Sequence, residues 1–361
     1  MTKLRELFRI RTFSLRTGLV LFIVLGVGFG LAGRWIQDVR ERGDAQLRLV
    51  QWRNGNRGND LHVYAQYPAV EAPSQFTSII RKYVHPEYRR HFESLKCNGA
   101  SLNSEIARDA KLSFGVSTVY LGCSHVDSGD AASLFQTFGL KELFVQSYSS
   151  GELSLGVSLL QLKEAKELEK VTLYCFLPDR VGEVVRDLPR LKEISVSACT
   201  PECIALLASN RTLQKLHIGS IRHSEGDFRA VDQVEEEFRE RSRRAMKQAL
   251  QALGDNPNFR SLSIQGQIHV AAEDLKEFCR TSQVNSVNLQ FPQIAPQCLE
   301  EFAKLGNLTS LCLYELSISD EHLASLYKAK KLKQLVIGPN VSADAILALR
   351  EKLPNCKISR Y

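Results

Sequence analysis

The sequence repeats one apolar pattern about every 24 residues, and this repetition constrains the fold more than any other feature. Each unit has apolar residues at its positions 1, 4 and 6. The units begin at Phe92, Val116, Leu140, Leu168, Leu191, Leu213, Phe259, Val284, Leu308 and Leu332. All thirty of these positions are apolar, although only 44% of the residues in the chain are hydrophobic. The period therefore predicts a stack of repeats instead of a domain built around one spherical core.

Each unit combines a strand pattern with a helix pattern. Positions 4 and 6 alternate as they do on one face of a strand. In the unit from 308 to 332, LTSLCLYELSIS is followed by Asp320 as a candidate N-cap, and then by Leu323, Leu326 and Tyr327 at helical spacing. Neither element can bury its apolar face alone. Stacked units are thus expected to form a parallel sheet on one side and a layer of helices on the other.

These units resemble the leucine-rich-repeat superfamily, whose pattern is L-x-x-L-x-L-x-x-(N/C)-x-L, and in particular bacterial repeats similar to LTSLCLYELSISDEHLASL at 308–326. The resemblance covers about 270 of the 361 residues and implies an α/β leucine-rich-repeat solenoid. Only Cys199 and Asn340 match the polar residue at position 9, so we expect irregular turns. With the N-terminal segment described next, the chain resembles a bacterial membrane-anchored leucine-rich-repeat protein.

An uncharged segment, TGLVLFIVLGVGFGLAG, occupies residues 17–33 and is followed by Arg34, Trp35 and Ile36. As a helix, residues 17–36 would span roughly 30 Å, the thickness of a bilayer's hydrocarbon core. The net charge is +4 before the segment and +1 over 34–50. The segment predicts a single transmembrane helix, with a cytoplasmic tail at 1–16 and an extracytoplasmic repeat domain.

A cleaved signal peptide is the alternative for this segment, because Gly30, Leu31 and Ala32 resemble a cleavage site. The apolar run and the tail before it are both long for a signal peptide. Lipidation here is excluded because Arg34 stands where a cysteine would be required.

The formal charge of +7 does not indicate nucleic-acid binding, because residues 1–34 alone carry +5. Basic residues crowded around an apolar segment are typical of membrane topology. Nine cysteines, without paired short spacings, favour buried thiols over a zinc site and leave their disulfide state open.

Two further segments lie outside the regular units. Residues 37–91 are a junction before a repeat domain at 92–361. The junction has a predicted loop at 52–60, and the segment 74–92, with apolar residues at helical spacing up to Pro86, is the predicted cap on the first repeat. The doubled interval contains a helical insertion at 227–256, interpreted either as a long helix on the convex side or as a protruding partner-binding helix. Oligomerisation through it is the alternative function.

No phosphate loop, nucleophile elbow, HExxH or Cys-x-x-Cys motif occurs in the sequence. We therefore expect no catalytic residues, no metal site and no cofactor. The expected function is a non-catalytic interaction or scaffolding module.

The candidate partner-binding residues come from positions 5 and 7, which should face outward from the concave sheet. They are almost uncharged: Lys96 is the single charged residue among twenty. Tyr120, Phe144 and Tyr174 lie on adjacent units and predict an aromatic patch, unless they only cover a shallow surface or pack under a loop. The predicted site residues are Tyr120, Phe144, Gln146, Tyr174 and His217. They suit a protein or peptide partner, or a cell-envelope carbohydrate.

Overall fold

The fold is described from a computed structural model of the full chain. The structure describes residues 159–222, 236–265, 272–290, 298–314 and 318–360, the strands at 61–66 and 91–98, residues 108–109, 117–122, 132, 134–136 and 140–146, and short stretches between 26 and 51.

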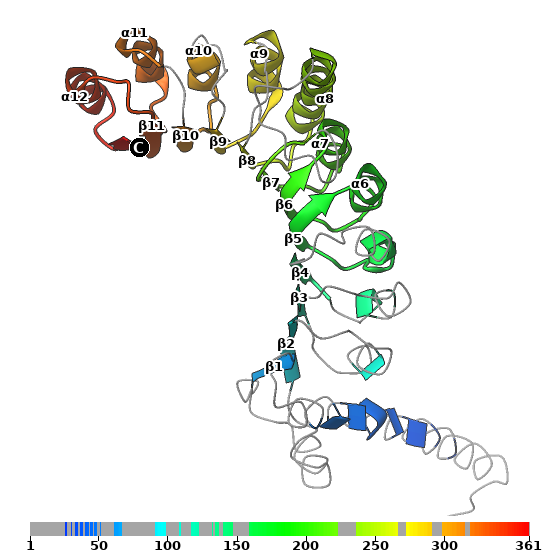
Figure 1. Ribbon diagram of the computed structural model, residues 1–361. Coiled ribbons are helices and arrows are strands. Elements are labelled where there is room, and N and C mark those ends of the chain that lie inside the picture. The colour runs from blue at the N-terminus through cyan, green and yellow to red at the C-terminus, as the bar shows by residue number, and fades with distance from the viewer. Residues whose placement is uncertain are drawn as a thin grey trace, which may run out of the picture.

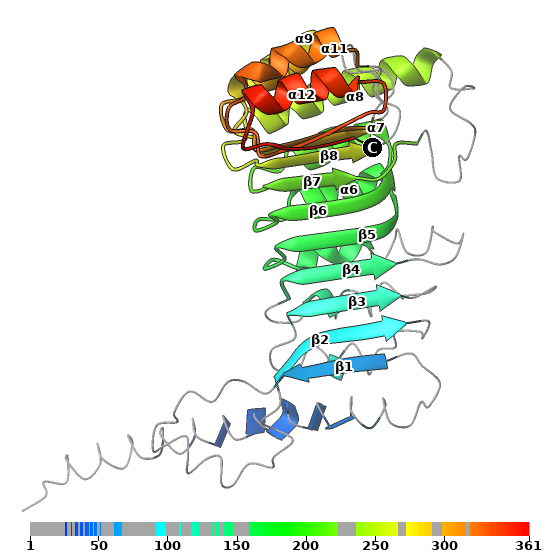
Figure 2. The same ribbon diagram turned by 90° about the vertical axis from the view of Figure 1, so that its left-hand side faces the viewer.

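Within these residues, twelve strands form one sheet whose spatial order is the order of the chain. The strands are β1 (Leu61–Gln66), β2 (His91–Asn98), β3 (Thr118–Gly122), β4 (Glu142–Gln146), β5 (Lys170–Leu177), β6 (Glu193–Cys199), β7 (Lys215–Ile218), β8 (Ser261–Gln265), β9 (Ser286–Gln290), β10 (Ser310–Tyr314), β11 (Gln334–Ile337) and β12 (Lys357–Arg360). All neighbours from β2 onward are parallel, and Figure 2 shows this for β2 to β8, where the sheet is seen face-on.

The helices cover the outer side of this curved sheet, and the strands line its inner, concave side (Figure 1). The described helices are η2 (Leu160–Glu164), α6 (Asp179–Arg186), α7 (Pro201–Ala208), α8 (Glu236–Gly254), α9 (Ala272–Thr281), α10 (Cys298–Ala303), α11 (Asp320–Leu323), η4 (Ala324–Lys328) and α12 (Ala343–Lys352). The predicted α/β solenoid, with a parallel concave sheet and convex helices, is therefore confirmed.

The core consists of the residues that carry the sequence pattern. Every residue at positions 1, 4 and 6 whose side chain is described is at most 3% exposed. Burying one such side chain contributes about 1.5–3 kcal/mol relative to leaving it in water. Helix residues such as Val185, Leu207 and Phe278 complete the same cluster from the convex side. The apolar face of each unit is thus covered by its neighbours.

A backbone hydrogen-bond pattern sets the register between successive strands. The carbonyl of Lys192, one residue before β6, accepts the N–H groups of both Gln214 and Lys215, at 2.7 and 2.9 Å. The carbonyl of Gln214 accepts those of Arg260 and Ser261 in the same way, at 2.8 and 3.0 Å. The second pair spans the doubled interval, so the additional residues leave the sheet without interrupting it.

Local capping chemistry starts several of the helices. Thr200 precedes α7 and accepts the Cys203 N–H at 3.1 Å, and Pro201 supplies the first helical residue. The predicted N-cap at Asp320 is wrong by one residue, because Ser319 holds the cap position of α11. The Asp320 carboxylate instead accepts the Ser342 N–H at 2.9 Å, which joins α11 to the N-terminus of α12. Hydrogen bonds from the Ser342 side chain and from this N–H lower the pKa of Asp320.

The N-terminal end of the sheet differs from the sequence prediction. β1 pairs antiparallel with β2, so a strand covers the edge of the first repeat. Residues 91–92 of the predicted cap at 74–92 belong to β2, and the part with helical spacing, up to Pro86, lies outside the described residues. The same is true of the predicted loop at 52–60.

The described residues between 26 and 51 are helical, and this segment contacts the repeat domain. Ala45 is fully buried, and the Arg48 guanidinium binds both carboxylate oxygens of Asp109, at 2.9 and 2.7 Å. Most of the predicted membrane segment, 17–36, lies outside the described residues. Among the described ones, no helix is both long and apolar enough to cross a membrane.

The stretch 227–256 contributes α8, which is 19 residues long, whereas the neighbouring α7 has eight. Ala245, Met246, Ala249, Leu250 and Leu253 bury the apolar side of α8 in the common core. The exposed side is charged. Residues 227–235 lie outside the described part of the chain.

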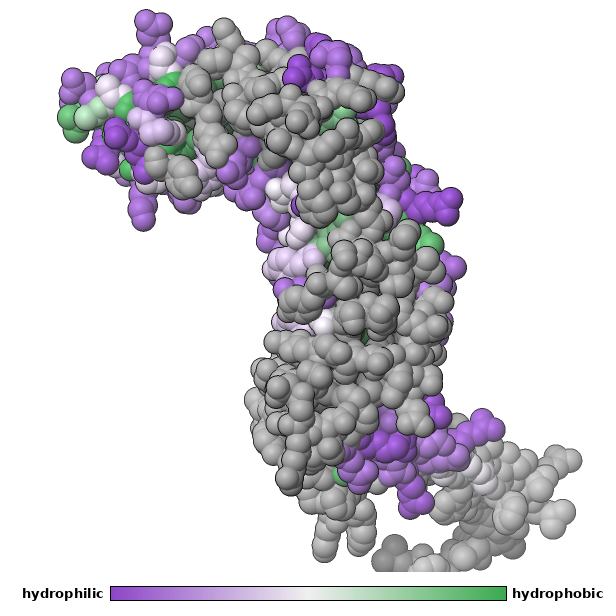
Figure 3. Space-filling view, viewed as in Figure 1, coloured by the Kyte–Doolittle hydropathy of each residue, from purple (hydrophilic) through white to green (hydrophobic). Residues whose placement is uncertain are grey.

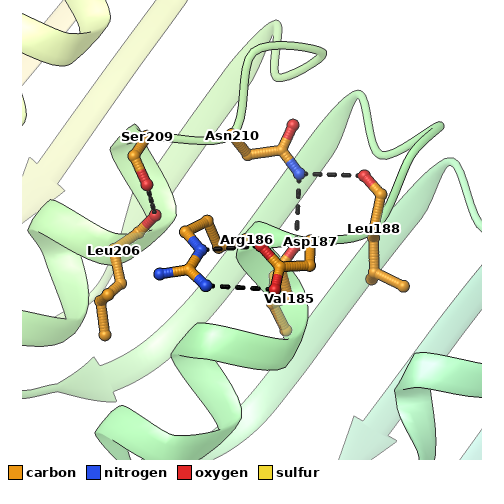
Figure 4. A network of polar contacts seen from close by, with 7 residues as sticks. All are labelled: Val185, Arg186, Asp187, Leu188, Leu206, Ser209 and Asn210. Atoms are coloured by element: carbon orange, nitrogen blue, oxygen red, sulfur yellow. Dashed lines mark hydrogen bonds and ion pairs between the residues drawn. The ribbon is translucent and has the colours of Figure 1, made fainter.

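Two buried asparagines connect successive helix ends on the convex side. The Asn210 amide donates to the carbonyls of Val185 and Leu188, at 3.2 and 3.1 Å, where α6 ends (Figure 4). The Asn210 carbonyl oxygen accepts the Thr212 N–H at 2.9 Å. Asn256 repeats this one unit later and donates to the backbone carbonyls of Asn210 and Leu213, at 3.2 and 2.9 Å. Three units are therefore joined by hydrogen bonds from buried side chains.

We predict that Asn210→Ala lowers the free energy of unfolding by about 2 kcal/mol, because it removes the hydrogen bonds that a buried amide makes to the carbonyls of Val185 and Leu188 and to the Thr212 N–H. Urea denaturation measures this. Asn307→Ala is the matched control: Asn307 is also in a connection after a helix, but it is exposed and bonds only to Gln283 and Lys331. A loss in Asn210→Ala no larger than in the control would contradict the prediction.

Candidate partner-binding surface on the concave sheet

The concave surface is built from positions 3, 5 and 7 of each unit, which alternate with the buried positions 4 and 6. Strand pairing places equivalent positions side by side, so Tyr120, Phe144 and Thr172 occupy one row, which Ser195 and His217 continue. Neighbouring members of a row are about 4.8 Å apart. In the space-filling view, the inner edge of the solenoid between β4 and β7 is pale to purple, which marks intermediate to hydrophilic residues (Figure 3).

An aromatic pair marks the N-terminal half of this surface. The rings of Tyr120 and Phe144 are stacked, with their centroids 4.5 Å apart and their planes inclined by 12°. The Lys170 ammonium lies 5.6 Å from the centroid of the Phe144 ring, within cation–π range. Both aromatic residues are half-buried, so part of each ring remains open to a partner.

Tyr174 belongs to a different part of the surface. It is 54% exposed and is in register with Gln146 of β4, which is also exposed. It is diagonal to Phe144, at a distance of about 7–8 Å between backbone positions. Of the three aromatic side chains, all within the described residues, only Tyr120 and Phe144 have rings in contact. The expected single patch is thus a stacked pair with a separate tyrosine beside it.

His217 lies two strands beyond Tyr174 and is not part of the aromatic pair. Its Nδ1 is 2.8 Å from the Ser263 hydroxyl on β8, across the doubled interval. Burial lowers the pKa of His217, since a half-buried site disfavours the charged ring. The imidazole is therefore neutral at physiological pH and acts as a hydrogen-bonding group.

The sequence prediction missed a charged row on the same face. Position 3 carries Glu142, Lys170, Glu193 and Lys215 on four successive strands, in register and with alternating sign. Lys170 lies 3.9 Å from Glu193, and Lys215 also pairs with that carboxylate. The two-residue alternation that selected positions 5 and 7 also places position 3 outward, so this row was readable from the sequence.

A second charged row lies one residue before each of β4, β5 and β6 and consists of Lys141, Glu169 and Lys192. On each strand its charge is opposite in sign to that of the position-3 residue. Lys192 donates to Glu169 at 2.6 Å. This hydrogen bond is the main reason why the pKa of Glu169 is lowered, with additional attraction from Lys192, Lys141 and Arg190. Charges of opposite sign therefore alternate both within each row and between the two rows, and they compensate one another along the edge of the concave surface.

The described residues contain no cluster of three or more His, Cys, Asp and Glu that could bind a metal ion. Six of the seven described cysteines are buried, and all seven have free thiols. Burial raises the pKa of Cys298 to about 11 and that of Cys279 further. The pKa of Cys203 is raised by its hydrogen bond to Cys199 and by burial. Thiolate nucleophiles are absent at neutral pH from these three positions.

Comparison with known proteins gives only distant similarities. No family model matches the chain, and no curated protein matches it. An internalin C2 of Listeria monocytogenes is 16% identical with a TM-score of 0.34, over 56% of this chain and 74% of that one. A chain of the yeast Rad7 and Elc1 complex is 16% identical with a TM-score of 0.37, over 97% of this chain and 94% of that one. A leucine-rich-repeat protein of Leptospira interrogans is 12% identical with a TM-score of 0.32, over 73% of this chain and 76% of that one. None of these values is high enough to transfer a function.

We predict a pH dependence of stability that Glu169→Gln removes. Since the pKa of Glu169 is lower in the folded than in the unfolded chain, its contribution is present above the unfolded value of about 4.3 and is lost as the pH falls through the folded value. The side chains of Glu169 and Lys192 are 33% and 48% exposed, so solvent screening limits the contribution to about 0.5 kcal/mol.

Denaturation of both proteins between about pH 6 and pH 3 measures this effect. Their free energies of unfolding should converge toward the acid end. Lys192→Met should reproduce the behaviour of Glu169→Gln, because it removes the other member of the pair. A constant difference between wild type and Glu169→Gln across this range would show that the ion pair does not form in solution.

Proposed function

We propose that this protein is a non-catalytic interaction module that captures a protein or peptide partner on the N-terminal half of its concave sheet. The observation that carries the proposal is the stacked pair of Tyr120 and Phe144, partly open on a face that is otherwise polar. Large aromatic side chains supply most of the binding energy in protein interfaces when they lie centrally and are surrounded by polar groups.

The surroundings of the pair support recognition of a specific partner. Gln146 and Tyr174 add an exposed amide and phenol on one side of it. The charged position-3 row, Glu142 to Lys215, borders it on the other side. An alternating row favours a partner whose charges have the complementary order, and it repels partners in which that order is shifted by one strand. His217 marks the far end of this surface as a neutral hydrogen-bonding group.

The proposal also holds that the protein does not catalyse a reaction. Among the described residues, His217 is the histidine on the concave face, and its polar neighbour Ser263 is not joined by a carboxylate that would orient the ring. Such an orienting group is part of the usual nucleophile and base arrangement. Binding therefore accounts for the surface better than chemistry does.

We predict that Tyr120→Ala with Phe144→Ala weakens partner capture at least tenfold and leaves the fold intact, since both rings lie outside the core. Proximity labelling from the intact protein identifies the partner, and a binding assay with that partner measures the loss. Leu347→Ala is the control, because Leu347 is a 56% exposed apolar residue on the convex helix α12. Undiminished capture by the double variant would overturn the site assignment.

The proposal includes a membrane tether at residues 17–36, with residues 1–16 in the cytoplasm and the repeat domain outside. Its support is the uncharged segment at 17–33 and the excess of basic residues before it. The alternative function, self-association through 227–256, has less support, because Ala245, Met246, Ala249, Leu250 and Leu253 of α8 are already buried within one chain.

We predict that protease added to intact cells or spheroplasts removes the repeat domain, whereas protease confined to the cytoplasmic side of inverted vesicles removes only the tail. Immunoblots with tags at the two ends measure this. Digestion of the repeat domain from the cytoplasmic side would reverse the orientation. Recovery of the whole chain in the fraction without membranes would contradict the tether.

A further inference from the structure

The concave faces of β8, β9 and β10 form a surface that differs from the N-terminal half, and we name it the neutral polar grid. Its nine members are Ser261, Ser263, Gln265, Ser286, Asn288, Gln290, Ser310, Cys312 and Tyr314. Strand pairing aligns them in three rows of three. Each is partly exposed, and the residues between them along each strand are buried.

The chemistry of the grid disfavours acidic partners. None of the nine side chains carries a charge, whereas the rows on β4 to β7 alternate in sign. A nucleic acid or an acidic polymer would lose hydration without meeting a cation among these nine side chains, and the adjacent Lys215 on β7 already pairs with Glu193. A neutral partner has no charge to desolvate, and the hydroxyl and amide groups of the grid can replace the water that it loses.

The grid also lacks the anchors proposed for the protein or peptide partner on the N-terminal half, which are a stacked aromatic pair and a charged row. β9 is hydrogen-bonded to β8 on one side and to β10 on the other, so no backbone edge is free for an added strand. No aliphatic side chain is present to form a pocket for an apolar anchor. What the grid offers is an array of hydroxyl and amide groups, which both donate and accept hydrogen bonds.

Asn288, at the centre of the grid, adds a specific requirement. Its Oδ1 is buried and accepts no hydrogen bond from any residue that the structure describes. A ligand hydroxyl reaching Asn288 after a small rotation of the amide would supply the missing donor. Tyr314, in the row with Gln265 and Gln290, provides the aromatic face on which a pyranose ring can stack.

We infer that the neutral polar grid binds a neutral oligosaccharide, laid across β8, β9 and β10 with its rings along the rows. Successive pyranose rings of an extended chain advance by roughly the separation of two strands, about 4.8 Å, so one ring lies over each strand. Hydroxyl groups then bond to Gln265, Asn288 and Gln290. This site is separate from the aromatic pair and does not depend on it.

Isothermal titration calorimetry of the intact chain with cellohexaose, chitohexaose and maltohexaose tests the inference, with hexagalacturonate as the charged counterpart. We expect at least one neutral sugar to bind and the acidic one not to bind. Asn288→Ala and, separately, Gln265→Ala should each weaken that binding at least fivefold without changing the thermal unfolding temperature. Failure of all three neutral sugars, or equal binding of hexagalacturonate, overturns the inference.

Gln146→Ala is the matched control, since it removes an exposed amide from the N-terminal half of the same face. It should leave sugar binding unchanged. Sugar binding retained in both Asn288→Ala and Gln265→Ala would place the sugar elsewhere and also overturn the inference. Because the assay uses neither the protein partner nor Tyr120 and Phe144, its outcome is independent of the proposed protein-binding function.

Discussion

The solenoid depends on a backbone arrangement repeated at the start of its strands, in which one carbonyl accepts two successive N–H groups from the next strand. From Ser117 to Thr309, each unit must present this carbonyl at the same height as the unit before it. That requirement explains why the apolar positions keep one phase although the spacing between units varies. It also explains why the doubled interval is tolerated: Arg260 and Ser261 bond directly to Gln214, and α8 lies outside the sheet.

Because the register is fixed, equivalent positions in the sequence become rows on the concave surface. The rows divide that surface into two chemically different halves. On β4 to β7, alternating charges compensate one another beside the stack of Tyr120 and Phe144. On β8 to β10, serines and amides replace the charges. One continuous sheet thus offers two surfaces of different chemistry, and a partner on one does not have to compete with a partner on the other.

The polar contacts were less predictable than the apolar ones. Asn210 and Asn256 stand three residues before a repeat start, where the neighbouring units have Leu188 and Leu305. An asparagine in a short connection is usual in any turn, so its type alone does not indicate burial. Only the stacking of α6, α7 and α8 brings the carbonyls of the preceding unit within reach of these amides.

The sequence by itself determined the repeat, the strand positions, the buried residues and the outward direction of Tyr120, Phe144, Gln146, Tyr174 and His217. It could do so because alternation along a strand and periodicity along a helix are local properties. The tertiary structure alone decided that the Tyr120 and Phe144 rings stack while Tyr174 lies apart, and that His217 meets Ser263 across the doubled interval. These contacts depend on how side chains of different strands are oriented toward one another, which periodicity does not encode.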